Sequence, residues 1–152
     1  MSSERNSILD QLQRSYTANA WHGPAVLEAL AGVDAEAARR RPIKSAHSIL
    51  EIVLHMAAWK DIVRRRLEGE KFDVTPDMDW PLPGEGPAAW EGARASLDRA
   101  HEQLRETIAR FDPARLDQAP AGGSSAYVLM HGIIQHDLYH TGQIALLRKA
   151  PA

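Results

Sequence analysis

The 152-residue sequence predicts an all-α protein, an antiparallel four-helix bundle with a long loop between its second and third helices. Four stretches repeat apolar residues at helical spacing, and turn-forming residues separate them. No stretch shows the sustained apolar–polar alternation of a half-buried β-strand. Because this length also suits one domain, we expect residues 1–152 to form a single bundle domain.

The first helical stretch covers residues 3–32 and contains one break. Its first apolar residues recur every four positions: Ile8, Leu12 and Tyr16. Pro24 has no N–H, and its ring crowds the preceding turn, so Gly23-Pro24 predicts a kink or break. Asp34 can then cap a short helical piece over residues 35–40.

The second helix is expected over residues 48–67. Ser48 and Glu51 have the spacing of a capping box, in which each side chain accepts a hydrogen bond from the other residue's backbone N–H. Residues 69–86 follow as a long loop with three prolines. A loop of this length in a compact domain is usually functional or partly ordered, and we expect Trp80 to pack back onto the bundle.

The third and fourth helices are expected over residues 87–111 and 125–149. Apolar residues of the third recur every seven positions: Trp90, Leu97, Leu104 and Phe111. This spacing is typical of the inner face of a bundle helix. The fourth helix follows the flexible Gly122-Gly123 pair and would be about 37 Å long.

Composition and charge exclude several classes of protein. The chain has no cysteine, which excludes disulfides, thiolate metal sites and cysteine nucleophiles. It has 18 Lys and Arg against 20 Asp and Glu, which argues against a nucleic-acid partner held by a basic face. No apolar run approaches the ~20 residues of a membrane span, and no signal-peptide pattern begins the sequence. We therefore expect a cytoplasmic protein with no membrane partner.

Three histidines replace apolar residues on helix faces that should point into the core. His136 and His140 are four residues apart, so both lie on one face, in line with Ile133 and Ile144. His55 lies within a similar apolar stripe of the second helix. Unpaired polar groups in a core cost about 1–3 kcal/mol each, and one divalent metal ion would satisfy all three rings. Separate hydrogen bonds for each ring are the alternative.

The segment from His136 to His140 invites comparison with the zinc-protease motif H-E-x-x-H, with Asp137 as the base. We reject this interpretation because residues 141–152 contain no third ligand. Asp137 also has a shorter side chain than glutamate, and we expect it to support a ligand or to lie on the surface.

The third ligand should therefore come from upstream. We rank His55 first, with His22 beside the helix break as its main competitor. His131 should point away from His136, because five residues turn a helix by about 140°. We expect His101 to be solvated and His47 to be a surface residue or to pack before the second helix.

Three segments of the chain together resemble the DinB/YfiT-like superfamily of bacterial metal-binding four-helix bundles. The segments, in order, are AWHGPAVLEALAGV at 20–33, HSILEIVLHMAAW at 47–59 and HGIIQHDLYHTGQIALLRKA at 131–150. The resemblance spans nearly the whole chain, and the two histidines followed by GQI are its most specific part.

The resemblance implies that His55, His136 and His140 are the metal ligands, the same three that the helix faces favour. It implies Zn²⁺ or Ni²⁺ and often a homodimer. Some similar proteins are transferases or isomerases that use a low-molecular-weight thiol, others look like metal-dependent hydrolases, and many have no known reaction.

Three imidazoles leave a divalent ion at least one open position, as in catalytic sites. The ion could hold a thiol as thiolate for attack on a small-molecule electrophile, and we favour this S-transfer. It could instead activate water for hydrolysis. That route works best with an acid or base near the water, for which Asp137, Tyr139, Gln143 and His22 are candidates. Gln143 could also orient a ligand or substrate.

A non-catalytic metal-binding stress protein is the third alternative, and a fourth protein ligand would favour it.

Overall fold

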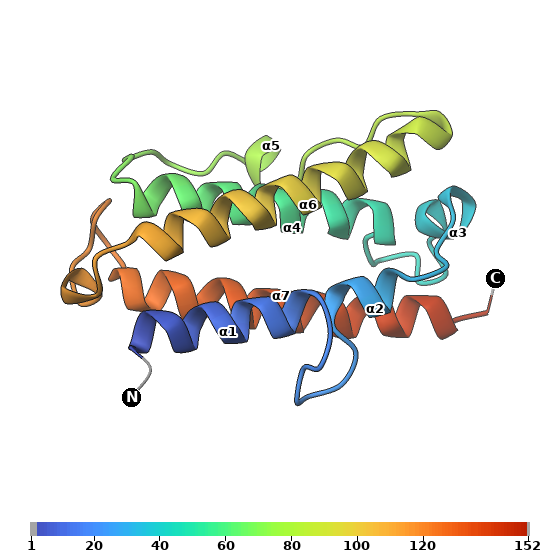
Figure 1. Cartoon of the computed structure of the whole chain (residues 1–152). Coiled ribbons are helices and arrows are strands. Elements are labelled where there is room, and N and C mark those ends of the chain that lie inside the picture. The colour runs from blue at the N-terminus through green and yellow to red at the C-terminus, as the bar shows by residue number, and fades with distance from the viewer. Residues whose placement is uncertain (1–2, 152) are drawn as a thin grey trace.

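The computed structural model describes residues 3–151, and every regular element in that range is helical. The elements in chain order are α1 (Glu4–Tyr16), α2 (Val26–Leu30), α3 (Ala35–Arg39), α4 (Ile49–Leu67), α5 (Pro76–Asp79), α6 (Gly86–Arg110), the short 3₁₀ helix η1 (Pro113–Arg115) and α7 (Ala126–Lys149). In Figure 1, α1 and α2 follow one line, and this line with α4, α6 and α7 forms a four-rod bundle. The prediction of an all-α bundle with a long connection is confirmed.

The predicted antiparallel arrangement holds for some pairs of rods and not for others (Figure 1). α4 and α7 run antiparallel, as do α1 and α6, where the Arg5 guanidinium donates to the Phe111 carbonyl at 3.3 Å. α4 and α6 instead run parallel and pack more extensively than any other pair of elements in the described range. Their last turns meet where Thr107 donates to Glu68 at 2.9 Å.

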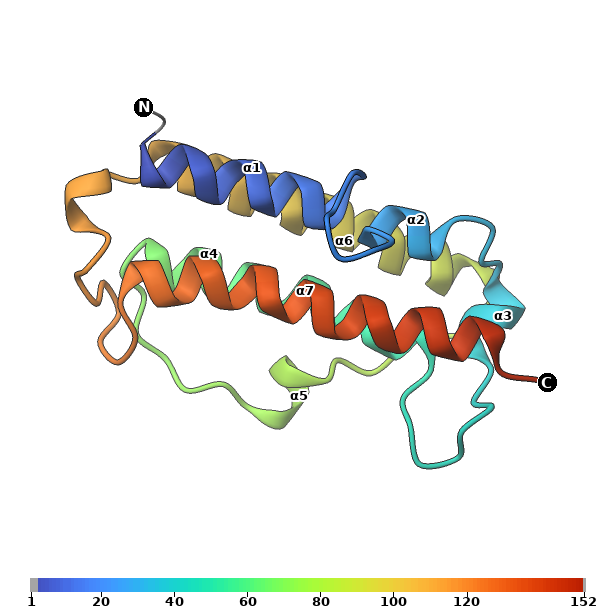
Figure 2. The ribbon, with the colours of Figure 1, turned by 90° about the horizontal axis from the view of Figure 1, so that it is seen from below.

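The crossover segment (residues 68–85) makes this parallel pair feasible. It leaves one end of α4, runs back beside the bundle and carries α5 on the way (Figure 2). A helix as long as α4 spans about 28 Å, whereas an extended chain of this length can reach about 60 Å. The segment is therefore long enough to return to the end from which α4 started.

The first helical stretch, predicted over residues 3–32, breaks earlier in the chain than Pro24 predicts. α1 ends at Tyr16, and α2 begins only at Val26. Asn19 has a φ of 63°, in the left-handed region, which a right-handed helix cannot include. A projecting loop therefore replaces the predicted kink at Gly23-Pro24.

The predicted helix caps are present. The Ser48 hydroxyl accepts from the Glu51 N–H at 3.3 Å, and the Glu51 carboxylate accepts from the Ser48 N–H at 2.7 Å. Asp34 caps α3 at the predicted position. Ser125 caps α7, so the long helix that carries two of the histidines begins where the sequence predicts.

The core consists of two apolar clusters along the bundle axis, separated by a polar layer. One cluster surrounds Trp90 and Met56, and the other surrounds Leu104 and Met130. Buried polar side chains from all four rods lie between them: Ser15, Lys60, His101, Asp137 and Thr141. The three candidate ligands lie at the same height along the axis.

His101 belongs to this layer, so the prediction that it is solvated is wrong. Its ring is 4% exposed and stacks on Tyr16 with centroids 3.7 Å apart. Neither ring nitrogen has a hydrogen-bond partner among the described residues. The face of α6 that looked polar in sequence is covered by the end of α1.

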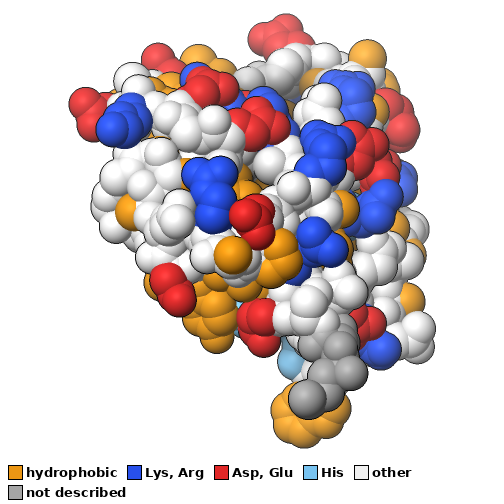
Figure 3. All heavy atoms as spheres, turned by 60° about the vertical axis from the view of Figure 1, so that its left-hand side comes forward, with side chains coloured by type: hydrophobic (Ala, Val, Ile, Leu, Met, Phe, Trp, Pro, Cys, Tyr) orange, Lys and Arg blue, Asp and Glu red, His pale blue; other side chains and the backbone are white. Residues whose placement is uncertain are grey.

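The surface carries charges of both signs. On the face in Figure 3, acidic and basic side chains are interspersed, and neither sign covers a continuous area. Between residues 3 and 151, no helix is both long and apolar enough to cross a bilayer.

Candidate metal centre

Two antiparallel helices bring the three predicted histidines together. His55 lies in the middle of α4, and His136 and His140 lie one turn apart in α7. One ligand atom from each ring lies within 4.8 Å of the other two. The Nε2 of His136 is 3.0 Å from the Nε2 of His55 and 3.1 Å from the Nε2 of His140. His22 lies outside this group.

The partners of the other ring nitrogens fix which nitrogen carries hydrogen. His55 Nδ1 lies 2.6 Å from the carbonyl oxygen of Asp79, which can only accept, so Nδ1 carries the hydrogen. His140 Nδ1 lies 2.6 Å from Gln143 Oε1 in the same way. Both rings therefore turn the lone pair of Nε2 toward the centre of the cluster.

The geometry fits a divalent cation. Lone pairs of neutral imidazoles repel one another at 3 Å unless a proton or a cation lies between them. The nitrogen of His136 that faces the other two rings is Nε2; its buried Nδ1 has no hydrogen-bond partner within residues 3–151. Zinc–nitrogen bonds of about 2.0–2.1 Å in a tetrahedral site place the ligand nitrogens about 3.3 Å apart. The two separations that His136 Nε2 makes, 3.0 Å to His55 Nε2 and 3.1 Å to His140 Nε2, are within a few tenths of an ångström of that value. Small ring adjustments would complete the site.

Burial keeps the rings in the form that binds metal. It lowers the pKa of His136 to about 3, with the neighbouring His140, His55 and Lys60 adding to the effect. Burial is also the main reason that the pKa values of His55 and His140 are lowered. All three imidazoles are therefore neutral at pH 7, and a metal ion need not displace protons from them.

The crossover segment holds His55 in place through two consecutive residues. The Asp79 carboxylate accepts from Trp59 Nε1 at 2.7 Å, while its carbonyl accepts from His55. The Trp80 ring lies between two imidazoles, 3.9 Å from that of His55 and 3.6 Å from that of His47. The prediction that Trp80 packs back onto the bundle is confirmed. No sequence signal pointed to Asp79, because its contribution comes through a backbone carbonyl.

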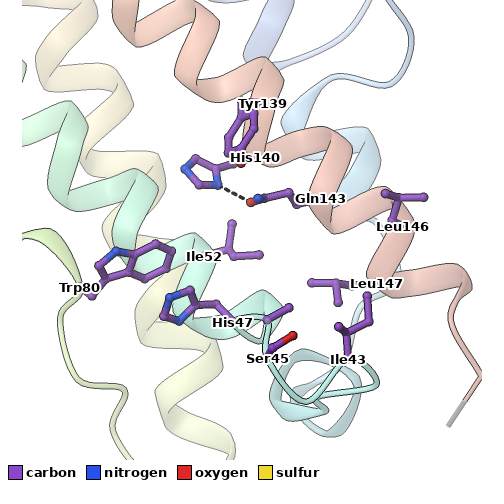
Figure 4. Close-up of a pocket in the computed structure, with 11 residues that line it drawn as sticks. Ile43, Ser45, His47, Ile52, Trp80, Tyr139, His140, Gln143, Leu146 and Leu147 are labelled. Atoms are coloured by element: carbon purple, nitrogen blue, oxygen red, sulfur yellow. Dashed lines mark hydrogen bonds between the residues drawn. The ribbon is translucent and has the colours of Figure 1, made fainter.

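A cavity of about 450 Å³ opens beside His140. Figure 4 shows Trp80 and His47 on one side of this cavity and the side chains of α7 on the other. Its walls are mostly apolar. Its polar side chains include Ser45, His47, His140 and Gln143, and also Tyr139, which the sequence offered as a candidate acid or base. An organic molecule of moderate size could therefore lie next to the three histidines.

The remaining candidate residues have different surroundings. His22 is exposed on the loop after α1 and lines a separate depression with Trp21 and Leu138. Gln143 lies in the site, as its hydrogen bond to His140 shows. Of the other histidines, His131 points away toward Glu4, as predicted, and His47 is a half-exposed wall of the cavity.

Asp137 is not a surface residue, so that alternative is wrong. It is fully buried and pairs with Lys60, with 2.6 Å between Oδ2 and Nζ. Its carboxylate makes no hydrogen bond to any of the three histidines in the described part of the chain. This placement agrees with the rejection of a protease-like base, because the carboxylate faces the core rather than the cavity.

The comparisons with known proteins give one match. The family model described as "DinB superfamily" matches residues 18–144, which include all three histidines of the cluster. A search of curated proteins and a search of solved structures each gave no match. Because the match covers most of the sequence, the chain belongs to the DinB superfamily.

Proposed function

We propose that this protein is a metal-dependent enzyme that transfers a low-molecular-weight thiol to a small electrophile. The observation that carries the proposal is the convergence of three neutral imidazoles beside a cavity. No fourth His, Cys, Asp or Glu joins the group within residues 3–151. Three protein ligands with an open position are typical of catalytic metal sites, whereas structural sites have four.

The chemistry requires a thiol that reacts as thiolate near neutral pH. A divalent ion held by the three rings would lower the pKa of a thiol that it binds and so supply the nucleophile. The thiol would release its proton to solvent, its sulfur would form a bond to the electrophilic carbon, and the leaving group would depart with the electron pair of the bond that breaks. No protein base is required for this step, which suits a site where Asp137 faces away.

The protein's own residues would orient the ligands and exclude water. Gln143 and the Asp79 carbonyl hold two of the imidazoles in the metal-binding tautomer. Ile52 and Leu147 give the cavity apolar walls. The electrophile would therefore be a largely apolar small molecule, bound where few waters compete with the thiolate.

Imidazole ligands suit zinc, nickel and several other divalent ions. We propose Zn²⁺ or Ni²⁺ as the resident ion. Elemental analysis of the protein purified without added metal would identify it, and a content well below one ion per chain would contradict the proposal.

A second candidate function is metal-dependent hydrolysis, which the position of His47 favours. This half-exposed imidazole lines the same cavity as His140 and could accept a proton from an attacking water. Unlike S-transfer, this reaction needs no thiol.

One assay separates the two functions. The metal-loaded protein is given a chromogenic electrophile with and without a panel of small thiols, and a chromogenic ester without thiol. S-transfer predicts a metal-dependent rate above that of each thiol alone, and its loss in His136→Ala. Hydrolysis predicts ester cleavage without thiol that falls in His47→Gln. Rates equal to the uncatalysed ones in both arms would contradict an enzymatic function for these substrate classes.

A further inference from the structure

A second cavity adjoins the histidine cluster on the side of His136. It has a volume of about 310 Å³ and is lined by Trp59, Arg66, Leu129, Gly132 and His136, among others. The cavity of Figure 4 touches His140 and Trp80 instead, and the two share no lining residue. The cluster therefore has a separate cavity on each of two sides, as a reaction between two molecules would require.

Arg66 is the charged residue of this second cavity, and it has no acidic partner within the described chain. Its two neighbours in α4 are both paired. Arg64 binds Asp61 at 2.7 Å and Glu68 at 2.8 Å, and Arg65 binds Glu70 at 2.8 Å. Arg66 makes neither a hydrogen bond nor an ion pair there, and its guanidinium lies 6.0 Å from the ring of Trp59 and 5.7 Å from that of Phe72.

An unpaired guanidinium at an apolar cavity is suited to an anion. Arginine presents a planar set of donors that matches a carboxylate, and the bond is stronger where water is partly excluded. The Trp59 ring is 5.9 Å from the ring of His136, so one indole separates the guanidinium from the histidine cluster. A short apolar chain along that indole would connect a carboxylate on Arg66 to an atom at the metal.

Gly132 keeps this space open. A Cβ added there would meet no atom within 4 Å, so close helix packing does not explain the glycine. A glycine inside a helix costs about 1 kcal/mol relative to alanine. A larger side chain at this position would enter the cavity, because Gly132 is part of its wall.

We infer that the second cavity binds the carboxylate of a small acidic thiol, with Arg66 as the anion-binding residue and the thiol directed to the metal. This inference rests on the proposed S-transfer function and names the class of its thiol. The other cavity then takes the electrophile. An aliphatic mercapto acid with several methylene groups has the required combination of groups.

The experiment compares an acidic thiol with its neutral analogue, and it does not require turnover. The protein is loaded with Co²⁺, and mercaptohexanoate or mercaptohexanamide is titrated while the thiolate-to-cobalt absorption band is recorded. Wild-type protein is expected to bind the acid about tenfold more tightly than the amide. Arg66→Gln should remove this preference, and Gly132→Leu should weaken both thiols.

Two matched variants serve as controls. Arg65→Gln removes the same charge from the adjacent residue, whose partner is Glu70, and should keep the tenfold preference. Gly142→Leu changes a glycine of the same helix that lines neither cavity and should leave both affinities unchanged. Circular dichroism would verify that each variant keeps its helices.

The outcomes distinguish this inference from the function on which it rests. Equal affinity of wild-type protein for the two thiols, or a preference that survives in Arg66→Gln, would overturn the anion site while leaving S-transfer in place. Absence of the band with both thiols would overturn thiol binding at the metal. In that case, calorimetric titration with hexanoate still tests whether Arg66 binds a carboxylate. Wild-type protein should bind hexanoate, and Arg66→Gln should not.

Discussion

Single hydrogen bonds hold two of the three histidines in the tautomer that can bind a metal ion. An imidazole has one lone pair in its neutral form, and the partner of the other nitrogen determines where that lone pair points. The Asp79 carbonyl does this for His55, and Gln143 does it for His140. The partners of the ligands are therefore as much a part of the site as the ligands themselves.

Replacing Gln143 tests this role. Gln143→Leu removes the acceptor for His140 Nδ1–H and should lower the affinity for Zn²⁺ by about 10–100-fold. Gln143→Glu keeps an acceptor in the same place and should retain most of the affinity. Competition with a chromogenic chelator measures both. Equal zinc affinity for wild-type protein and Gln143→Leu would show that the ring needs no such partner.

His101 should make the protein sensitive to acid. Burial lowers its pKa from 6.5 to about 3, with Lys60 and Arg105 as smaller causes. Between these values the unfolded chain binds a proton that the folded protein does not, so the free energy of unfolding decreases as the pH falls from 6.5. The slope for one such group is up to about 1.4 kcal/mol per pH unit.

His101→Phe should reduce that loss, because phenylalanine keeps the stack on Tyr16 without a titrating group. Urea denaturation at several pH values between 4 and 7 measures the slope for both proteins. The same slope in the variant would show that other groups cause the acid sensitivity.

At the scale of helices, α4 and α7 carry the histidine cluster, and a buried ion pair also joins these two helices. α4 and α7 are joined in the polar layer by Lys60 and Asp137, which are both fully buried. Burial raises the pKa of Asp137, and the adjacent Lys60 opposes that shift. The pair lies close to the histidine cluster in sequence, since Asp137 follows His136 directly. The Lys60–Asp137 ion pair can favour one alignment of α4 against α7 without adding to the free energy of unfolding, and the two effects can be measured separately.

A double-mutant comparison makes this separation. Lys60→Met alone leaves a buried carboxylate without a partner and should lower the free energy of unfolding by about 3–5 kcal/mol. Adding Asp137→Leu should recover most of that loss, because two apolar side chains replace the pair. Chemical denaturation of the two variants gives the values. A double variant as unstable as Lys60→Met would mean that the ion pair itself stabilises the fold.

At the scale of the whole molecule, the candidate centre links the two apolar halves of the core. The histidines join α4 to α7 between the two clusters, and the crossover segment covers them from outside. A metal ion bound there would stabilise the folded chain and not the unfolded one. Folding and metal binding are therefore expected to be coupled.

Metal removal should lower the thermal stability. Free Zn²⁺ at 100 times its dissociation constant contributes about 2.7 kcal/mol, which corresponds to a rise in Tm of about 5–10 °C for a chain of this size. Calorimetry with and without a chelator measures the shift. His136→Ala should show no metal-dependent shift, and a shift as large as that of wild-type protein would place the metal elsewhere.

The sequence by itself determined the features that depend on neighbours along the chain. The four helical stretches, the Asp34 and Ser48 caps and the common face of His136 and His140 follow from helix geometry and local hydrogen bonds. The candidate ligand from α4 could also be selected, because His55 interrupts an apolar stripe.

Only the tertiary structure decided the features that depend on packing between distant segments. The parallel direction of α4 and α6, the burial of His101 under α1 and the support of His55 by Asp79 all join residues far apart in sequence. Arg64, Arg65 and Arg66 look alike in sequence, but the acids of the described chain pair with the first two and leave Arg66 without a counter-charge there. Hydrophobic periodicity shows which face of a helix is buried, but not which helix covers it or in which direction that helix runs.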